Sequence, residues 1–353
     1  MSYKIGLLLS LLVGSMLLIV APFSTAWASE LHQDNCEKAR NIIFMVPDGL
    51  SISNVTAARI LKNGPNGDPL TMEDFPEIGY QRTHSADSTV TDSAAAASAW
   101  ACGQKFKNRE ISCHSEKLKE CTGEIPETIM EIAQKKGKAT GLVATSQISH
   151  ATPAAFAAHS PNRYCGAEIA RQYVAETEVD LVLGGGVYKT KQDYNCQQFA
   201  ASWHGLKAKY NNATCQEQFV DLAQNKGYSV IRDKNGLEQG ISGVDNKLIG
   251  LFRPYGKGKT PEMFRLRQFG VEVPEYPETE PTLPDMTTAA LKFLENDKNG
   301  FFLMIEGSQI DWANHTNDDV NGNVGSNGTK ALKYQLAETL AFNRAIGEVK
   351  DWL

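Results

Sequence analysis

Four short, mainly apolar runs recur along the chain and predict buried β-strands. Each is almost continuous in apolar residues, as expected for a strand covered on both faces of a sheet. The runs span residues 41–46, 139–144, 181–183 and 300–305. Helical patterns occur at 52–61, 93–100, 124–136, 153–159, 286–295 and 332–349. Strands that alternate with helices predict an α/β fold, here a three-layer sandwich with a mostly parallel central sheet.

The segment 188–278 is more polar than its surroundings and is interrupted by Pro, Gly and Asn. Residues 228–231 and 248–252 are the strand candidates within it. Prolines 274, 277, 281 and 284 predict an extended surface loop over 274–284, because proline lacks a backbone N–H and interrupts regular structure. No internal repeat is visible, so we expect one domain over residues 29–353.

The first 28 residues have the pattern of a secretory signal peptide. Lys4 supplies the positive charge, residues 5–20 form the apolar stretch, and Ala26-Trp27-Ala28 is a small-residue cleavage site. An uncleaved membrane anchor is the alternative, since the apolar stretch approaches spanning length. The cleavage site favours removal, so we expect an exported chain without a stable membrane anchor, either periplasmic in a bacterium or secreted.

The charge and the cysteine content indicate whether to expect nucleic-acid binding and disulfide bonds. The formal net charge is -6 and no Lys/Arg cluster indicates a basic groove, so nucleic-acid binding is not expected. Seven cysteines in an exported chain predict some disulfides. Spacing along the sequence suggests Cys113 with Cys121 and Cys196 with Cys215, and the odd number leaves one cysteine over.

Polar residues follow three of the predicted strands at the point where each strand ends. They are Asp48, residues 145–152 and residues 306–315. Because ligands of such sheets bind beyond the carboxyl ends of the strands, we expect these segments to meet at one edge. Within 306–315, Asp311 and His315 have the i,i+4 spacing that places both on one side of a helical turn. A carboxylate and an imidazole suit zinc, although a solvated loop is the plainer interpretation.

Ser93 stands at the start of a run of small residues, at or near the N-terminus of a predicted helix. Free N–H groups and the helix dipole favour an anion there. A serine in this position is commonly a helix cap. The alternative is a nucleophile that forms a bound phosphoryl or acyl group, and the spacing alone leaves both open.

Four motifs together resemble the alkaline phosphatases, which are metal-dependent phosphomonoesterases. The motifs occur in the family's order and span nearly all of the mature chain. They are Val46-Pro47-Asp48-Gly49, residues 90–97, residues 150–155 with Arg163, and residues 306–315. The resemblance favours the nucleophile interpretation of Ser93. It implies a covalent phosphoserine on Ser93, a phosphate held bidentately by Arg163, and orientation of that guanidinium by Asp92.

The resemblance also implies two zinc ions and one magnesium ion, small phosphomonoester substrates and a homodimer. Asp48 would bridge the zinc beside Ser93 and the magnesium, which Thr152 and Glu306 would also bind. Asp311 and His315 would bind the other zinc. Close metal ions suit in-line displacement at phosphorus, and a metal makes a serine hydroxyl a better nucleophile.

Two positions depart from the best-known enterobacterial pattern. His150 stands where an aspartate occurs, and Trp312 where a lysine can occur. We expect His150 to touch the magnesium site only through water, with altered magnesium affinity and pH dependence but the same reaction. His84 and His159 are interpreted as structural.

Family members continue beyond the predicted helix 332–349 with further strands and zinc ligands. In this sequence one zinc set keeps Asp48 and Ser93, and the other Asp311 and His315. We therefore expect a C-terminally truncated member with little or no phosphatase activity. A remnant that only binds metal or phosphate is one alternative. A sulfatase or phosphodiesterase is another, which residues 91–95 (Thr-Asp-Ser-Ala-Ala) argue against.

Overall fold

The central element is a parallel six-stranded sheet with the strand order β1-β8-β4-β5-β7-β6. The computed structural model describes residues 39–187, 215–243, 247–252, 279–315 and 326–353. The strands are β1 (Ile42–Pro47), β8 (Phe301–Gly307), β4 (Ala139–Ala144), β5 (Leu181–Gly184), β7 (Leu248–Leu251) and β6 (Ser229–Ile231). All six predicted strands are present, which confirms the α/β fold with a mostly parallel sheet.

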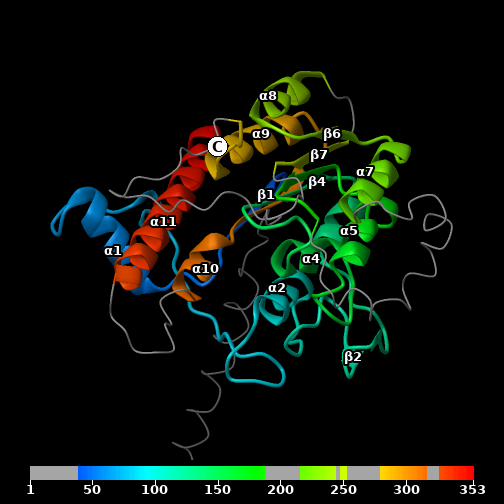
Figure 1. Ribbon diagram of the computed structural model, residues 1–353, viewed down its shortest axis with the longest axis horizontal. Helices are drawn as coiled ribbons and strands as arrows, with labels where there is room; N and C mark the ends of the chain where they lie inside the picture. Colours follow the sequence, from blue (N-terminus) through cyan, green and yellow to red (C-terminus); the bar gives the residue numbers. More distant parts are fainter. Residues whose placement is uncertain (1–38, 188–214, 244–246, 253–278, 316–325) are drawn as a thin grey trace, which may run out of the picture. The chain divides into compact units, whose positions relative to one another are not determined.

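Helices cover both faces of this sheet (Figure 1). One apolar core contains side chains of Phe302, Met304 and Leu142 from the sheet. The second contains Leu303 and Ile305, which point to the opposite face because side chains alternate along a strand. The helices on the first face are α2 (Ser93–Cys102), α3 (Ile129–Lys135), α4 (Ala151–Ala157), α5 (Gly166–Ala175) and α7 (Cys215–Asn225). Those on the second are α8 (Lys234–Gly243), α9 (Leu283–Leu294) and α11 (Ser326–Trp352).

Several predicted helix boundaries were wrong, among them those of α11 and α4, and capping explains two others. The helix expected over 124–136 begins only at Ile129, because the Thr128 hydroxyl accepts the N–H of Glu131 and the Glu131 carboxylate accepts that of Thr128. The predicted loop through 284 ends earlier, since α9 begins at Leu283 with Pro284 in its first turn, where proline is tolerated.

Several elements were not predicted from the sequence. They are α5, α7, α8, the 3-10 helix η1 (Thr71–Glu73), and the hairpin of β2 (Ser115–Glu116) with β3 (Glu120–Cys121). The expected Cys113–Cys121 disulfide joins the ends of this hairpin and is confirmed, with a Cα–Cα distance of 5.7 Å. Cys196 lies outside the described residues, as does the predicted signal peptide over residues 1–28. No helix in the described part of the chain is long and apolar enough to cross a membrane.

Candidate active site

The ends of three neighbouring strands bring the predicted acidic residues together. Glu306, the penultimate residue of β8, is in register with Val46 of β1 and with Ala144 of β4. Asp48 follows β1 directly, and residues 145–152 follow β4. Gly49 allows a further close approach, because a Cβ there would lie 2.7 Å from the Cα of Asp311. The expected convergence at one sheet edge is therefore observed.

Ser93 is the first helical residue of α2, and its neighbour Asp92 is the cap. The Asp92 carboxylate accepts the N–H of Ala95 at 3.0 Å, which satisfies a backbone donor of the first turn. The Ser93 hydroxyl is therefore not needed as the cap, and it donates to Oδ2 of Asp48 at 3.0 Å. This geometry removes the plainer interpretation of Ser93 and places its oxygen beside an acidic side chain.

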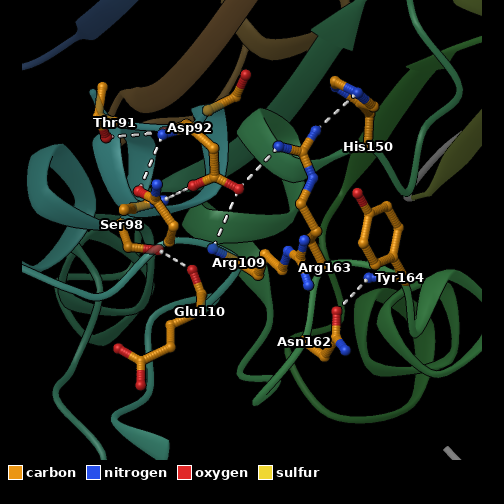
Figure 2. A network of polar contacts seen from close by, with 12 residues as sticks. Thr91, Asp92, Ser98, Arg109, Glu110, His150, Asn162, Arg163 and Tyr164 are labelled. Atoms are coloured by element: carbon orange, nitrogen blue, oxygen red, sulfur yellow. Dashed lines mark hydrogen bonds and ion pairs between the residues drawn. The ribbon is translucent and has the colours of Figure 1, made fainter. Parts of the chain in front are cut away.

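Arg163 joins Asp92 to His150 (Figure 2). Its Nη1 donates to Oδ2 of Asp92 at 3.0 Å, and its Nη2 contacts Nε2 of His150 at 3.0 Å. A guanidinium only donates hydrogen bonds, so His150 must accept through Nε2 and is neutral. Burial and the charge of Arg163 both lower the pKa of His150 well below its usual range, in agreement with that assignment. Arg163 is thus held in one orientation from two sides.

Glu306 is fully buried, and only one of its two carboxylate oxygens has described hydrogen-bond partners. Its Oε2 accepts the hydroxyls of Ser308 at 2.5 Å and Ser146 at 3.4 Å. Thr152 also contributes a side-chain hydrogen bond to this carboxylate. Oε1 is buried and has no hydrogen-bond partner among the described residues. A carboxylate oxygen left in this state suits a cation, because burying it without a partner is unfavourable.

The electrostatics of the acidic group agree with a cation site. Burial, followed by repulsion from Asp48, raises the pKa of Glu306 to about 8. Burial and then repulsion from Asp311 raise the pKa of Asp48 to about 6, against the hydrogen bond from Ser93 that lowers it. A bound cation would offset this repulsion. Two carboxylates and the Thr152 hydroxyl form an oxygen-only donor set, which is the kind that magnesium prefers.

Asp311 and His315 lie one turn apart on α10 (Gln309–His315), as their spacing predicted. Nε2 of His315 is 3.3 Å from Oδ2 of Asp311, and the His315 side chain is 73% exposed. Zinc in proteins takes three or four protein ligands. The described residues contain no group of three or more His, Cys, Asp and Glu side chains that could hold a metal. The described donors thus fit a magnesium site better than either zinc site.

Several residues around the site were not singled out by the sequence analysis. Ser308 and Ser146 hold Glu306, and the backbone N–H of Arg109 donates to Oδ2 of Asp92 at 3.1 Å. Asn108 accepts the N–H of Asp92 through its side-chain oxygen at 3.1 Å. Single serines such as Ser308 and Ser146 have no distinctive sequence spacing. Arg109 and Asn108 reach the site from a loop whose path no local pattern predicts.

Comparisons with known proteins point to one family over nearly the whole described chain. The family model for alkaline phosphatase matches residues 39–352. Alkaline phosphatase 3 of Bacillus subtilis is 34% identical over 304 residues, which are 84% of this chain and 56% of that protein. The alkaline phosphatase from the Antarctic bacterium TAB5 superimposes with a TM-score of 0.64 at 26% identity, covering 88% of this chain and 74% of that one.

A histidine-to-glutamate mutant of the TAB5 enzyme, with Mg bound in its M3 site, gives a TM-score of 0.63 at 25% identity. It covers 88% of this chain and 73% of its own. The present chain therefore spans a little over half the length of its Bacillus relative and about three quarters of these two structures. With the family model matched over nearly all the described residues, the chain belongs to the alkaline phosphatase family.

Proposed function

We propose that this chain carries the phosphoryl-transfer site of a phosphomonoester hydrolase, with Ser93 as the nucleophile. The observation that carries the proposal is the hydrogen bond from the Ser93 hydroxyl to Asp48 at 3.0 Å, at the N-terminus of a helix that another residue caps. An anion is favoured at such a helix end. The similarity to alkaline phosphatases supports the same reaction.

Ser93 Oγ would form a bond to phosphorus as the bond from phosphorus to the alcohol oxygen breaks, which leaves a phosphate ester on the serine. The hydroxyl proton would pass to Asp48, and the departing oxygen would take a proton from solvent. The hydrogen bond from Ser93 to Asp48 fixes the direction of the hydroxyl proton, so that a lone pair is available for attack. Arg163 would bind the phosphate oxygens with the N–H groups that Asp92 and His150 do not occupy. Water would then hydrolyse the phosphoserine and release inorganic phosphate.

Asp48, Thr152 and Glu306 would hold a magnesium ion, and the Mg-bound TAB5 relative supports this choice of cation. Asp48 with Ser93, and Asp311 with His315, would supply two ligands each to zinc. When bound, these ions would supply positive charge that offsets the charges of the phosphate and of the serine oxygen. The count of two zinc ions and one magnesium ion stays a prediction from the family resemblance.

Turnover of p-nitrophenyl phosphate by the purified chain, with zinc and magnesium added, tests the proposal. We expect low turnover, which Ser93→Ala should abolish and which Ser53→Ala, a change at an exposed serine outside the site, should leave unchanged. Acid quenching followed by mass spectrometry should find phosphate on Ser93 alone. Unchanged turnover in Ser93→Ala would overturn the proposal. Magnesium binding without any turnover would instead support the alternative of a chain that only binds metal or phosphate.

We also propose that the chain is exported after cleavage before Ser29. The Cys113–Cys121 disulfide supports this, because such bonds persist in oxidising compartments. N-terminal sequencing of the protein from the medium or periplasm should begin at Ser29. A start at Met1 in the membrane fraction would support the uncleaved anchor. The homodimer stays a prediction of the resemblance, which sedimentation of the purified chain would test.

A further inference from the structure

Arg109 has an unusual backbone for a long side chain. Its φ is 78°, in the left-handed region that glycine adopts readily and that other residues seldom adopt. The surrounding contacts hold it there. Its N–H donates to Oδ2 of Asp92, and its carbonyl accepts the N–H of Arg163 at 2.8 Å. Outliers of this kind gather at functional sites. Here the outlier contacts both Asp92 and Arg163, which together we call the phosphate clamp.

These two contacts use only backbone atoms of residue 109. They therefore do not explain why its side chain is an arginine. The Arg109 guanidinium lies over the ring of Tyr164, 5.8 Å from the ring centroid, which is within the range of a cation–π contact. In Figure 2 Arg109 lies between Asp92 and Tyr164, beside Arg163. Tyr164 follows Arg163 in the sequence. The ring thus fixes a second guanidinium next to the clamp.

The charge of Arg109 has no described counter-ion. Among the residues that the structure describes, no carboxylate forms an ion pair with Arg109, whereas the charge of Arg163 is paired with Asp92. Arg109 is exposed whereas Ser93 and Arg163 are half-buried, so anionic groups in solvent can reach the Arg109 side chain. In a chain of net charge -6, an uncompensated cation beside an anion site attracts additional negative charge.

We propose that Arg109 is a specificity-determining residue that binds a second anionic group on the leaving-group side of the substrate. An in-line attack by Ser93 directs the leaving group away from the serine, and we take the exposed Arg109 side chain, whose backbone contacts Asp92 and Arg163, to face that group. The preferred substrates are then phosphomonoesters whose alcohol portion carries a carboxylate or a further phosphate. This inference rests on the proposed function, because it takes Arg163 and Ser93 as the phosphate site.

Two matched substrates test it, phenyl phosphate and 4-carboxyphenyl phosphate. The quantity measured is the ratio of kcat/KM for the second substrate to kcat/KM for the first. The variant Arg109→Gly removes the cation but keeps both backbone contacts, and glycine adopts the left-handed conformation without strain. We expect this variant to lower the ratio about threefold to fivefold, as for an exposed ion pair. Lys119→Ala, which removes an exposed charge on the β2–β3 hairpin, should leave the ratio unchanged.

The dependence of the kcat/KM ratio on salt concentration separates a direct electrostatic role of Arg109 from a structural one. The wild-type ratio should fall as ionic strength rises, and the Arg109→Gly ratio should not, because salt screens exposed charges. Arg109→Lys should keep part of the preference, since the charge remains but the planar contact with Tyr164 does not. An Arg109→Gly ratio equal to that of the wild type would overturn the inference.

Binding distinguishes failure of this inference from failure of the proposed function. Calorimetry with phenylphosphonate and 4-carboxyphenylphosphonate measures the same preference as a ratio of Kd values, without any turnover. Absence of turnover with an Arg109-dependent Kd ratio would contradict the proposed hydrolysis and support the anion site. A Kd ratio that Arg109→Gly does not change, or no binding of either phosphonate, would overturn the role of Arg109.

Discussion

Asp92 has two functions that depend on different properties of one side chain. Its Oδ1 caps α2 by accepting the N–H of Ala95, and its Oδ2 accepts hydrogen bonds from Arg163 and from the Arg109 backbone. Capping needs an acceptor oxygen, which an amide can also provide. Orienting a guanidinium is stronger when the acceptor carries a negative charge. The residue thus couples the start of the Ser93 helix to the position of Arg163.

Substitution of Asp92 by Asn and by Ala separates these two functions. Because Asn retains the cap, we expect Asp92→Ala to lower the free energy of unfolding by about 1 kcal/mol more than Asp92→Asn does. Both variants should lower kcat/KM for phosphomonoesters, since both lose the charge that orients Arg163. Urea denaturation and steady-state kinetics measure the two effects. Equal stability of the two variants would show that the cap contributes nothing measurable.

The free energy of unfolding should depend on pH because of the pair formed by His159 and Glu131. Nδ1 of His159 contacts the Ser112 carbonyl at 2.6 Å and its Nε2 contacts Glu131 at 3.1 Å. Burial lowers the pKa of His159, but the hydrogen bonds to Glu131 and Ser112 outweigh it, so the net shift is upward. The stabilisation is therefore complete below the usual pKa of 6.5 and is lost as pH rises through the higher folded-state pKa.

The same pair also loses its stabilisation in acid. Glu131 is the acceptor, and burial raises its pKa, but the hydrogen bonds from His159 and Thr128 produce a net decrease. Its contribution is present above the usual value of 4.5 and is lost as pH falls through the folded-state pKa. We expect His159→Gln to cost about 1–2 kcal/mol at about pH 6 and less at about pH 9. The control His84→Gln, at an exposed histidine, should cost no more at about pH 6 than at about pH 9 in urea denaturation. A pH-independent loss of stability in His159→Gln would contradict the role given to the His159–Glu131 pair.

Site residues whose neighbours in the chain reveal their role could be predicted from the sequence. Ser93, Asp48 and Glu306 each adjoin an apolar run or a helix start, so their place at the sheet edge could be predicted. The contact of His150 with Arg163 and that of Arg109 with Asp92 could not. Both depend on how loops from different elements pack against one another, and no local pattern of residues contains that information.

At the scale of elements, apolar runs predicted the sheet well because its central strands β8, β4, β5 and β7 are almost entirely buried between helices on both faces. The helices α5, α7 and α8 lack clear start signals or lie in a segment that favours irregular structure. α5 begins after Cys165, whose side chain makes no capping hydrogen bond, and α7 and α8 lie within the polar segment 188–278, where Gly236 and Gly240 lower the helix propensity of α8. Packing of an apolar side against the sheet stabilises all three helices.

The N-terminus of α9 illustrates how capping chemistry decides a boundary. The Thr282 hydroxyl accepts the N–H of Asp285 at 3.3 Å, while the Asp285 carboxylate accepts the Thr282 N–H at 2.8 Å. We expect Thr282→Ala to lower the free energy of unfolding by about 1 kcal/mol, because it leaves a helix donor without its acceptor. Thr282→Ser keeps the hydroxyl and should cost much less. A similar loss in both variants, measured by urea denaturation, would argue against the cap.

At the scale of the whole molecule, the acidic site links the fold to cation binding. Its ligand candidates come from segments far apart in the chain, and they meet only when β1, β8 and β4 are paired. A cation that binds there stabilises the folded state alone, so its binding free energy adds to the free energy of unfolding. The repulsion between Glu306 and Asp48 means that the same cation also removes an unfavourable interaction.

Magnesium should therefore stabilise the chain through Glu306, whether or not the chain turns over substrate. At a free concentration ten times the Kd, we expect magnesium to raise the free energy of unfolding by about 1.4 kcal/mol. Glu306→Gln should abolish this increase, because an amide lacks the charge that holds the cation. Glu116→Gln, at an exposed glutamate of the β2–β3 hairpin, should retain it. Thermal and urea denaturation with and without magnesium measure the difference, and an equal increase in Glu306→Gln would place the bound cation elsewhere in the molecule.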